Sequence, residues 1–424
     1  MEQPAAVAAI TAAAPATSHP GQRHRWKVLA AGVAANAAFS AVFSGIPVTS
    51  VVLRSDYQLS NGQLGLALGL LSLGVALGEL PWGVLTDRLG DRKVLLAGLL
   101  GTSAALWLLM LRALPGHGAA TYVWLCAGLM LAGLLGGSVN GASGRAVMGW
   151  FGEGERGLAM SIRQTAVPLG GGVGALLLPT LAARAGFGAV YGALMAGCLA
   201  SVGLILLWLR EPPPAPASAT PTSAAAPALR RLLVWRLALG IGLLCAPQVA
   251  LISFGGIFLH EVGQASLILI SALLTLVQIG GAVARISSGR WTDRRGQRRG
   301  YLRLCAWLSA LLFALLGVLS VFFQQGAGIG LPWLALALVV AGVVVSAWHG
   351  VAYTELAVVA GSAQVGTALG LGNSCVFLVF FLTAQAIPPL LQWQGWPAVW
   401  LATALVALAV VPLFPAAGEG KRGR

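Results

Sequence analysis

The amino-acid sequence predicts an all-α polytopic membrane protein. Only 9% of its 424 residues are charged, where a soluble domain carries about 25%, and 58% are apolar, with a mean hydropathy of +0.84. The apolar residues form continuous stretches of about 20 residues, which is the length that a helix needs to cross the hydrocarbon core. Such stretches are too long for the alternating strands of a membrane β-barrel. The composition is too apolar for a disordered chain, and five cysteines are too few for a secreted disulfide scaffold.

Twelve crossings are expected, six on each side of a break at 211–231. Six prolines in this break exclude a helix and are typical of a flexible linker. The expected crossings are 27–53, 61–85, 94–114, 121–149, 157–182, 187–209, 232–259, 265–288, 301–323, 331–357, 364–390 and 396–415. The domains that follow are a disordered tail at 1–26, a six-helix bundle at 27–210, the linker, a second six-helix bundle at 232–415 and a basic tail at 416–424.

The distribution of basic residues predicts the orientation in the membrane. Most of the 26 lysines and arginines fall in loops on one side, and only Arg54, Arg112 and Arg184 fall on the other. Since basic loops stay in the cytoplasm, both tails and the linker are expected there, in a protein of the plasma (inner) membrane. The formal net charge of +14 is thereby explained without a nucleic-acid partner.

One sequence motif occurs twice, 206 residues apart. Residues 83–93 and 289–299 both match G-x-x-x-D-R-x-G-x-R-[K/R]. The matched residues are Gly83, Asp87, Arg88, Gly90 and Arg92 in the first copy, and Gly289, Asp293, Arg294, Gly296 and Arg298 in the second. A weaker match relates crossings 5 and 11, where Gly157 aligns with Gly366. The chain is therefore expected to contain two parallel, pseudo-symmetric halves.

The doubled motif resembles the signature that follows helices 2 and 8 in the major facilitator superfamily. This resemblance implies twelve helices in two six-helix bundles, and secondary transport by alternating access. The glycines would permit tight turns and close helix contacts. Each aspartate could accept hydrogen bonds from basic neighbours or from a helix N-terminus. We expect the motifs to act as a latch on the cytoplasmic side, with Asp87, Arg88, Asp293 and Arg294 as its main members; the alternative is that they only anchor the topology.

Two ionisable residues are expected deep within the membrane. Arg285 would cost about 2.5–3.5 kcal/mol at the membrane centre, so it needs either an anionic substrate or a structural ion pair. Its segment 284–289 also resembles helix 8 of monocarboxylate and other organic-anion porters, in which an arginine serves the anion. Glu79 lies 206 residues earlier, at the equivalent position. It could carry a proton, or it could serve as a fixed hydrogen-bonding or ion-pair partner.

Further candidates complete the expected site. The superfamily resemblance implies that helices 1, 4, 7 and 10 line a central cavity, and their polar residues are Asn36, Asn140, Gln248, His349 and Tyr353. His349 could titrate near neutral pH or could simply be hydrogen-bonded. Gln164 and Asn373 are weaker candidates. Arg145 and Arg163 are expected to join the latch by pairing with Asp87, Asp293 or Glu355.

The leading hypothesis is a secondary transporter that moves a small organic anion with a proton. The alternative is a drug or metabolite exporter, although 168–172 only partly resembles the antiporter motif of drug exporters. A membrane-embedded enzyme is a remote alternative, because no H-E-x-x-H, G-x-S-x-G or phosphate-binding loop occurs. A receptor is equally remote, because it would normally carry a sizeable soluble region, which this sequence does not predict. No cofactor or metal is expected. The expected partners are the substrate, a proton and the lipid bilayer, with the protein acting as a monomer.

Overall fold

The computed structural model describes residues 20–116, 119–210, 227–326 and 330–415, and these ranges contain helices and no strand. The helices of the first half are α1 (Pro20–Val48), α2 (Ser50–Asp56), α3 (Asn61–Leu89), α4 (Asp91–Arg112), α5 (Ala119–Gly136), α6 (Ser138–Trp150), α7 (Arg156–Gln164) and α8 (Ala166–Trp208). Those of the second half are α9 (Leu232–Glu261), α10 (Leu267–Arg295), α11 (Arg298–Gln324), α12 (Leu331–Ser346), α13 (His349–Ala360) and α14 (Val365–Val410). Three 3₁₀ turns, η1 (Ala228–Arg230), η2 (Ser362–Gln364) and η3 (Val411–Leu413), complete the elements.

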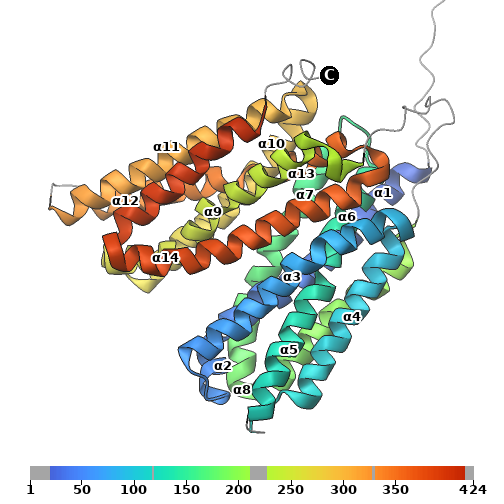
Figure 1. The fold of residues 1–424 in the computed structure, drawn as a ribbon, viewed down its shortest axis with the longest axis horizontal. Helices are drawn as coiled ribbons and strands as arrows, with labels where there is room; N and C mark the ends of the chain where they lie inside the picture. Colours follow the sequence, from blue (N-terminus) through green and yellow to red (C-terminus); the bar gives the residue numbers. More distant parts are fainter. Residues whose placement is uncertain (1–19, 117–118, 211–226, 327–329, 416–424) are drawn as a thin grey trace, which may run out of the picture.

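Ten helical stretches of the described chain are apolar and long enough to cross a membrane, and two of them are long enough to cross it twice. These two span 53 and 52 residues, which would reach about 80 Å as straight helices, against a hydrocarbon core of about 30 Å. Each is interrupted by a glycine in the left-handed region, Gly186 in α8 (φ 73°) and Gly395 in α14 (φ 69°). In Figure 1, α14 folds back on itself between its orange and dark red parts. The predicted all-α fold with twelve crossings is therefore confirmed.

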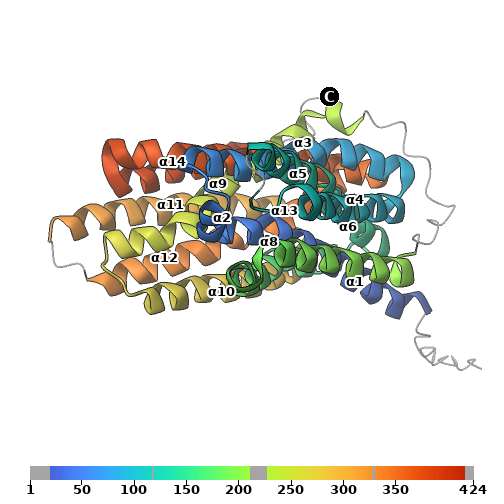
Figure 2. The same cartoon turned by 90° about the horizontal axis from the view of Figure 1, so that it is seen from below.

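The two halves form separate bundles that meet along two seams. Figure 1 shows them converging at one end and diverging towards the other. The end that carries Asp87 and Asp293 is called the motif end below, and the end that carries Gly186 and Gly395 is called the far end. In Figure 2, α3 and α14 lie on one side of the molecule, and α1 and α10 on the opposite side. The first seam joins α3 to α14, and the second joins α7 to α10.

Glycines bring the helices of both seams into backbone contact. A Cβ atom added to Gly370 would lie 2.5 Å from the carbonyl oxygen of Glu79, and one added to Gly83 would overlap the carbonyl of Gly366. In the second seam, a Cβ on Gly157 would lie 2.8 Å from the carbonyl oxygen of Gly289. Only glycine, which has no side chain, permits this approach. The same type of glycine contact occurs in both seams.

The first element begins earlier than the sequence predicted. The first crossing was expected at 27–53, but α1 already begins at Pro20, so 20–26 is helical and is not part of a disordered tail. Arg25 lies on this extension and forms a bidentate pair with Glu155 at 2.6 and 3.0 Å, which holds the first turns against the loop before α7. The remainder of the predicted tail, 1–19, lies outside the described residues, as do 211–226 of the linker and 416–424. Residues 228–230 of the linker form η1.

Candidate functional site

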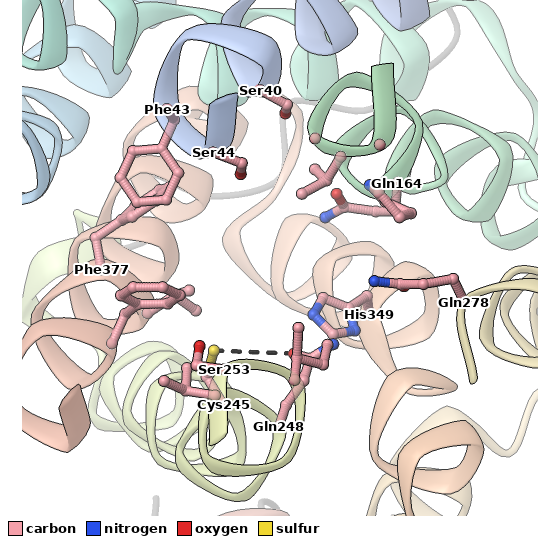
Figure 3. A pocket seen from close by; sticks show the side chains of 18 of the residues that line it. Ser40, Phe43, Ser44, Gln164, Cys245, Gln248, Ser253, Gln278, His349 and Phe377 are labelled. Atoms are coloured by element: carbon pink, nitrogen blue, oxygen red, sulfur yellow. Dashed lines mark hydrogen bonds between the residues drawn. The ribbon is translucent and has the colours of Figure 1, made fainter. Parts of the chain in front are cut away.

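A cavity of about 640 Å³ lies between the two halves. Its lining comes from α1, α6, α7, α8, α9, α10, α13 and α14, so that neither half forms it alone. Figure 3 shows Gln164, Gln278 and His349 on one side, and Phe43 and Phe377 on the other. The polar residues of the lining are Ser40, Ser44, Asn140, Gln164, Gln248, Ser253, Thr275, Gln278, Arg285, His349, Tyr353 and Asn373.

Arg285 lies at the boundary between the halves and is held by backbone carbonyls. Its Nε donates to the carbonyl of Ser346 at 2.7 Å, and its Nη1 donates to the carbonyl of Gln164 at 3.0 Å. These acceptors are available because α12 ends at Ser346 and α7 ends at Gln164, so the last carbonyls of both helices lack helical partners. Within the described chain Arg285 pairs with no carboxylate, so these residues provide no structural ion pair for it.

The Arg285 guanidinium keeps donors for a ligand. It has five N–H groups, and the two bonds above use the Nε hydrogen and one Nη1 hydrogen. In the described chain Nη2 donates to no acceptor. It is also not fully enclosed by protein, because it is absent from the set of inaccessible polar atoms that lack a partner. The side chain is 5% exposed, and this remaining surface faces the cavity.

The predicted cavity residues of α9 and α13 surround this arginine. Gln248 donates to the hydroxyl of Ser346 at 3.3 Å. His349 contacts the Ser346 carbonyl through Nδ1 at 3.2 Å and stacks on Trp348, with 3.8 Å between ring centroids. Tyr353 donates to Oδ1 of Asn373 at 2.5 Å. The break between α12 and α13 thus brings Gln248 and His349, two of the predicted cavity residues, together at Ser346.

Glu79 lies beside the cavity and not in it. It is fully buried in α3, and its Oε1 accepts a hydrogen bond of 2.5 Å from Nδ2 of Asn140, which does line the cavity. Its Oε2 has no partner within the described residues. Asn140 also accepts from Arg163, through its carbonyl at 2.7 Å and through Oδ1 at 3.4 Å. Asn140 therefore connects a buried carboxylate to a buried arginine.

Two sequence expectations about these buried residues are wrong. Arg163 was expected in the latch, but it is 2% exposed and donates to Asn140 and to the hydroxyl of Ser143 at 2.8 Å, so it points into the first half. Asn36 was expected in the cavity, but it is fully buried in α1 and does not line it. Both amide atoms of Asn36 lack a partner within the described chain.

At the motif end, Asp87 caps the N-terminus of a helix in the other half. Its carboxylate accepts from the backbone N–H groups of Gly366 (2.8 Å) and Thr367 (2.7 Å), and from the hydroxyl of Thr367 (2.7 Å). These residues begin α14, where the N–H groups have no helical partners and the helix dipole favours an anion. Asp87 and Asp91 also pair with Arg145, at 3.3 and 2.7 Å.

Asp293 makes the equivalent contacts in the second seam. It accepts from the backbone N–H groups of Gly157 and Leu158, both at 2.9 Å, at the start of α7. Arg298 donates to it at 3.2 Å. The repeat also places a glycine after each motif helix, Gly90 (φ 89°) after α3 and Gly296 (φ 65°) after α10.

Other motif residues lie away from the seams. Arg88 and Arg294 were expected beside the aspartates in the latch, but both are exposed, and they make no ion pair within the described residues. Arg92 donates to the carbonyl of Leu206 in its own half at 3.0 Å. Glu355 was expected to join the network of Asp87 and Asp293, but it pairs with Arg299 at 2.6 Å.

Sequence reasoning missed the aromatic wall and the polar face of α10. Phe43 packs edge-on against Phe377 and Phe380, with centroids 5.0 and 5.7 Å apart. Asn373, Phe377 and Phe380 follow i, i+4, i+7 spacing, which places them on one helix face and was visible in the sequence. Gln278 lies seven residues before Arg285, again on the same face. The described part of the chain contains no cluster of three or more histidine, cysteine, aspartate or glutamate residues suited to a metal ion.

Comparisons with known proteins agree with this architecture. Residues 29–384 match the family model of the Major Facilitator Superfamily. An uncharacterized MFS-type transporter of Mycobacterium tuberculosis (strain H37Rv) is 29% identical over 395 residues, covering 92% of this chain and 85% of that protein. Its counterpart in strain CDC 1551 is 30% identical over the same shares.

Solved structures of transporters share the fold. The human organic anion transporter MFSD10 has a TM-score of 0.72 at 18% identity, covering 93% of this chain and 100% of that one. The proton:xylose symporter XylE has a TM-score of 0.72 at 13% identity, with coverage of 93% and 97%. FucP in its outward conformation has a TM-score of 0.69 at 16% identity, with coverage of 91% and 97%. The relatives are transporters and not enzymes, and the chain belongs to the major facilitator superfamily of membrane transporters.

Proposed function

We propose that this protein is a secondary active transporter that moves a small organic anion together with a proton by alternating access. The observation that carries the proposal is Arg285, a buried cation at the cavity that has no carboxylate partner among the described residues. A guanidinium with free N–H donors binds a carboxylate as a fork, and the anion neutralises the charge that the protein leaves uncompensated.

Glu79 is the proposed proton site. It is fully buried, and only one of its two oxygens has a protein partner in the described chain. Its partner Asn140 lines the cavity and also accepts from Arg163, while the next residue, Gln164, accepts from Arg285. The proposed anion and proton sites thus meet at the break between α7 and α8. Loading of either site changes contacts at the same break, which supplies a physical route for coupling.

The aspartate contacts supply the proposed gate. Asp87 and Asp293 hold the N-termini of α14 and α7 at the motif end, where the two halves converge. The basic residues of this end support a cytoplasmic orientation for it, with both termini and the linker on the same side. Alternating access then requires both aspartates to release their helices while the far end closes around the loaded site. One chain supplies both halves, so a monomer is sufficient.

Export of a drug or metabolite is the second candidate. The apolar cavity wall formed by Phe43, Phe377 and Phe380 favours it, because exporters of apolar compounds need such a surface. The two candidates differ in their dependence on Arg285, since a neutral apolar substrate gains nothing from the guanidinium.

The test is transport of radiolabelled carboxylates by the full chain in proteoliposomes with an imposed pH gradient. Arg285→Ala removes a charge-assisted contact of about 1.5–3 kcal/mol, so we expect a loss of about 10- to 100-fold in apparent affinity. Arg285→Lys keeps the charge and should retain part of the activity. Arg184→Ala, an exposed arginine near the far end, is the matched control. Normal carboxylate transport by a folded Arg285→Ala protein refutes the anion function.

A further inference from the structure

We propose that the substrate is an amphipathic monoanion, in which one carboxylate is joined to an aromatic or compact apolar body. This inference rests on the proposed anion function and adds the shape and charge of the substrate. It follows from two features of the cavity: a wall of phenylalanines opposite a wall of amides, and a single cation.

The aromatic wall is built from both halves of the protein. Phe43 of α1 meets Phe377 of α14 edge-to-face at 5.0 Å with an interplanar angle of 77°, and it meets Phe380 at 5.7 Å and 70°. All three rings are half-buried and line the cavity. Edge-to-face packing leaves ring faces and edges available, which suits a further aromatic ring or a branched apolar group.

The polar wall faces the aromatic one across the cavity. On α10, Gln278 lies two helical turns from Arg285, or about 10 Å towards the far end. On α14, Phe377 and Phe380 lie one and two turns from Asn373 in the same direction. Figure 3 shows Phe43 and Phe377 across the cavity from Gln278 and His349. A ligand with its carboxylate on Arg285 therefore has its body between an apolar and an amide surface.

The charge of the cavity favours a single carboxylate. Arg285 is the one lysine or arginine in the described lining, and that lining contains no aspartate or glutamate. A second carboxylate on the ligand would lose its hydration without gaining a cation, which is costly. Gln164, Gln248 and Gln278 offer amides, which satisfy hydroxyl or carbonyl groups on a ligand but do not neutralise a charge.

Four small competitors separate the elements of this proposal. The full chain in lipid vesicles is tested for counterflow of radiolabelled benzoate and of radiolabelled acetate. Each is competed with unlabelled benzoate, acetate, phthalate and benzamide. Acetate lacks the apolar body, phthalate adds a second charge, and benzamide keeps the ring without the charge. We expect benzoate to compete at a concentration about ten-fold lower than the other three, equivalent to about 1.4 kcal/mol.

The outcomes distinguish this inference from the proposed function. Equal competition by acetate, benzoate and phthalate, with benzamide inactive, overturns the amphipathic monoanion but leaves anion transport intact. Equal competition by benzamide and benzoate overturns both, and so does the absence of counterflow with either labelled acid. Preference for benzoate over all three supports both.

A variant pair tests the aromatic wall directly. Phe377→Ala should raise the half-saturation concentration for benzoate about ten-fold and change that for acetate less than about two-fold. Phe377→Tyr keeps the ring and should restore benzoate selectivity. Phe322→Ala removes a phenylalanine of α11 that is 44% exposed and remote from the lining, and it should leave both values unchanged. A parallel change for acetate and benzoate in folded Phe377→Ala protein overturns the inference.

Discussion

Replacing Asp87 and Asp293 with asparagine should shift the protein from the conformation described here towards one that is open at the motif end. Asn has the size of Asp but only one acceptor oxygen, and its NH₂ group would face N–H donors. At Asp87, two backbone N–H groups and one hydroxyl of α14 lose a charged acceptor. At Asp293, two backbone N–H groups of α7 lose their charged acceptor.

The size of the shift follows from these contacts. Loss of one charge-assisted hydrogen bond costs about 1.5–3 kcal/mol. Loss of the anion at the helix N-terminus adds about 0.3–1 kcal/mol. Each single variant should therefore favour opening by about 2–4 kcal/mol, or roughly 30- to 1,000-fold. The double variant should reach about 4–8 kcal/mol, and about 5.5 kcal/mol moves an equilibrium from 1:99 to 99:1.

The assay is a distance measurement between spin labels at the far end. Val51 of α2 and Trp393 of α14 are 78% and 75% exposed and belong to different halves, so each accepts a label in a background without the five native cysteines. Opening of the motif end should bring these labels closer together. Asp56→Asn, an exposed aspartate near the far end, is the control and should leave the distance distribution unchanged. An unchanged distribution in the double variant would refute the latch.

Three further predictions test other contacts. Glu79→Gln should abolish uptake driven by a pH gradient and retain counterflow exchange, because the amide cannot carry a proton. Accumulation driven by the gradient at the level of the unmodified protein would exclude Glu79 as the proton site. Gly370→Ala should lower stability by about 1–3 kcal/mol in thermal unfolding, because its Cβ would meet the Glu79 carbonyl, whereas Gly197→Ala, with open space around it, should not. Glu355→Gln should cost about 1.5–3 kcal/mol, because it removes a charge-assisted hydrogen bond from a buried carboxylate. It should leave the label distances unchanged, because its partner Arg299 lies in the same half.

Much of the fold could be predicted because it follows from local signals. Crossing lengths come from apolar run length, and the predicted breaks at 183–186 and 391–395 contain the glycines at which the two longest stretches reverse. The internal repeat predicted that Asp87 and Asp293 occupy equivalent positions. The breaks at Thr165 and at Ala347 were not predicted. Pro168, which has no N–H to donate to the Gln164 carbonyl, is a sequence signal for the first break, whereas no proline or charge marks the second. These breaks expose the carbonyls that hold Arg285, and only the contact with Gln164 had such a signal.

Depth along a helix and side-chain direction were the other gaps. Asn36 lies on the same face of α1 as Ser40 and Phe43, at i, i+4, i+7 spacing, but one turn nearer the motif end, where it is fully buried and does not line the cavity. Membership of a helix face does not specify at which depth the cavity ends. For Arg163 the missing information was direction. Its place near a helix end suggested a surface role, but its direction takes it to Asn140 and Ser143 inside the bundle.

The repeat relates Glu79 to Arg285, and their different surroundings explain how two equivalent positions can serve different purposes. Each lies one to two turns from its motif, on the helix that forms a seam with the other half. In the α3–α14 seam, Gly370 packs directly on the backbone of Glu79, which closes that seam around the carboxylate. In the other seam, the break after Gln164 leaves space beside Arg285, and the guanidinium reaches the cavity. An uncharged ring or amide in the substrate could bind either wall, but a formal negative charge has one accessible counter-charge in the described lining. The asymmetry between the seams therefore supports the proposed division into a proton site, which needs no cavity, and an anion site, which does.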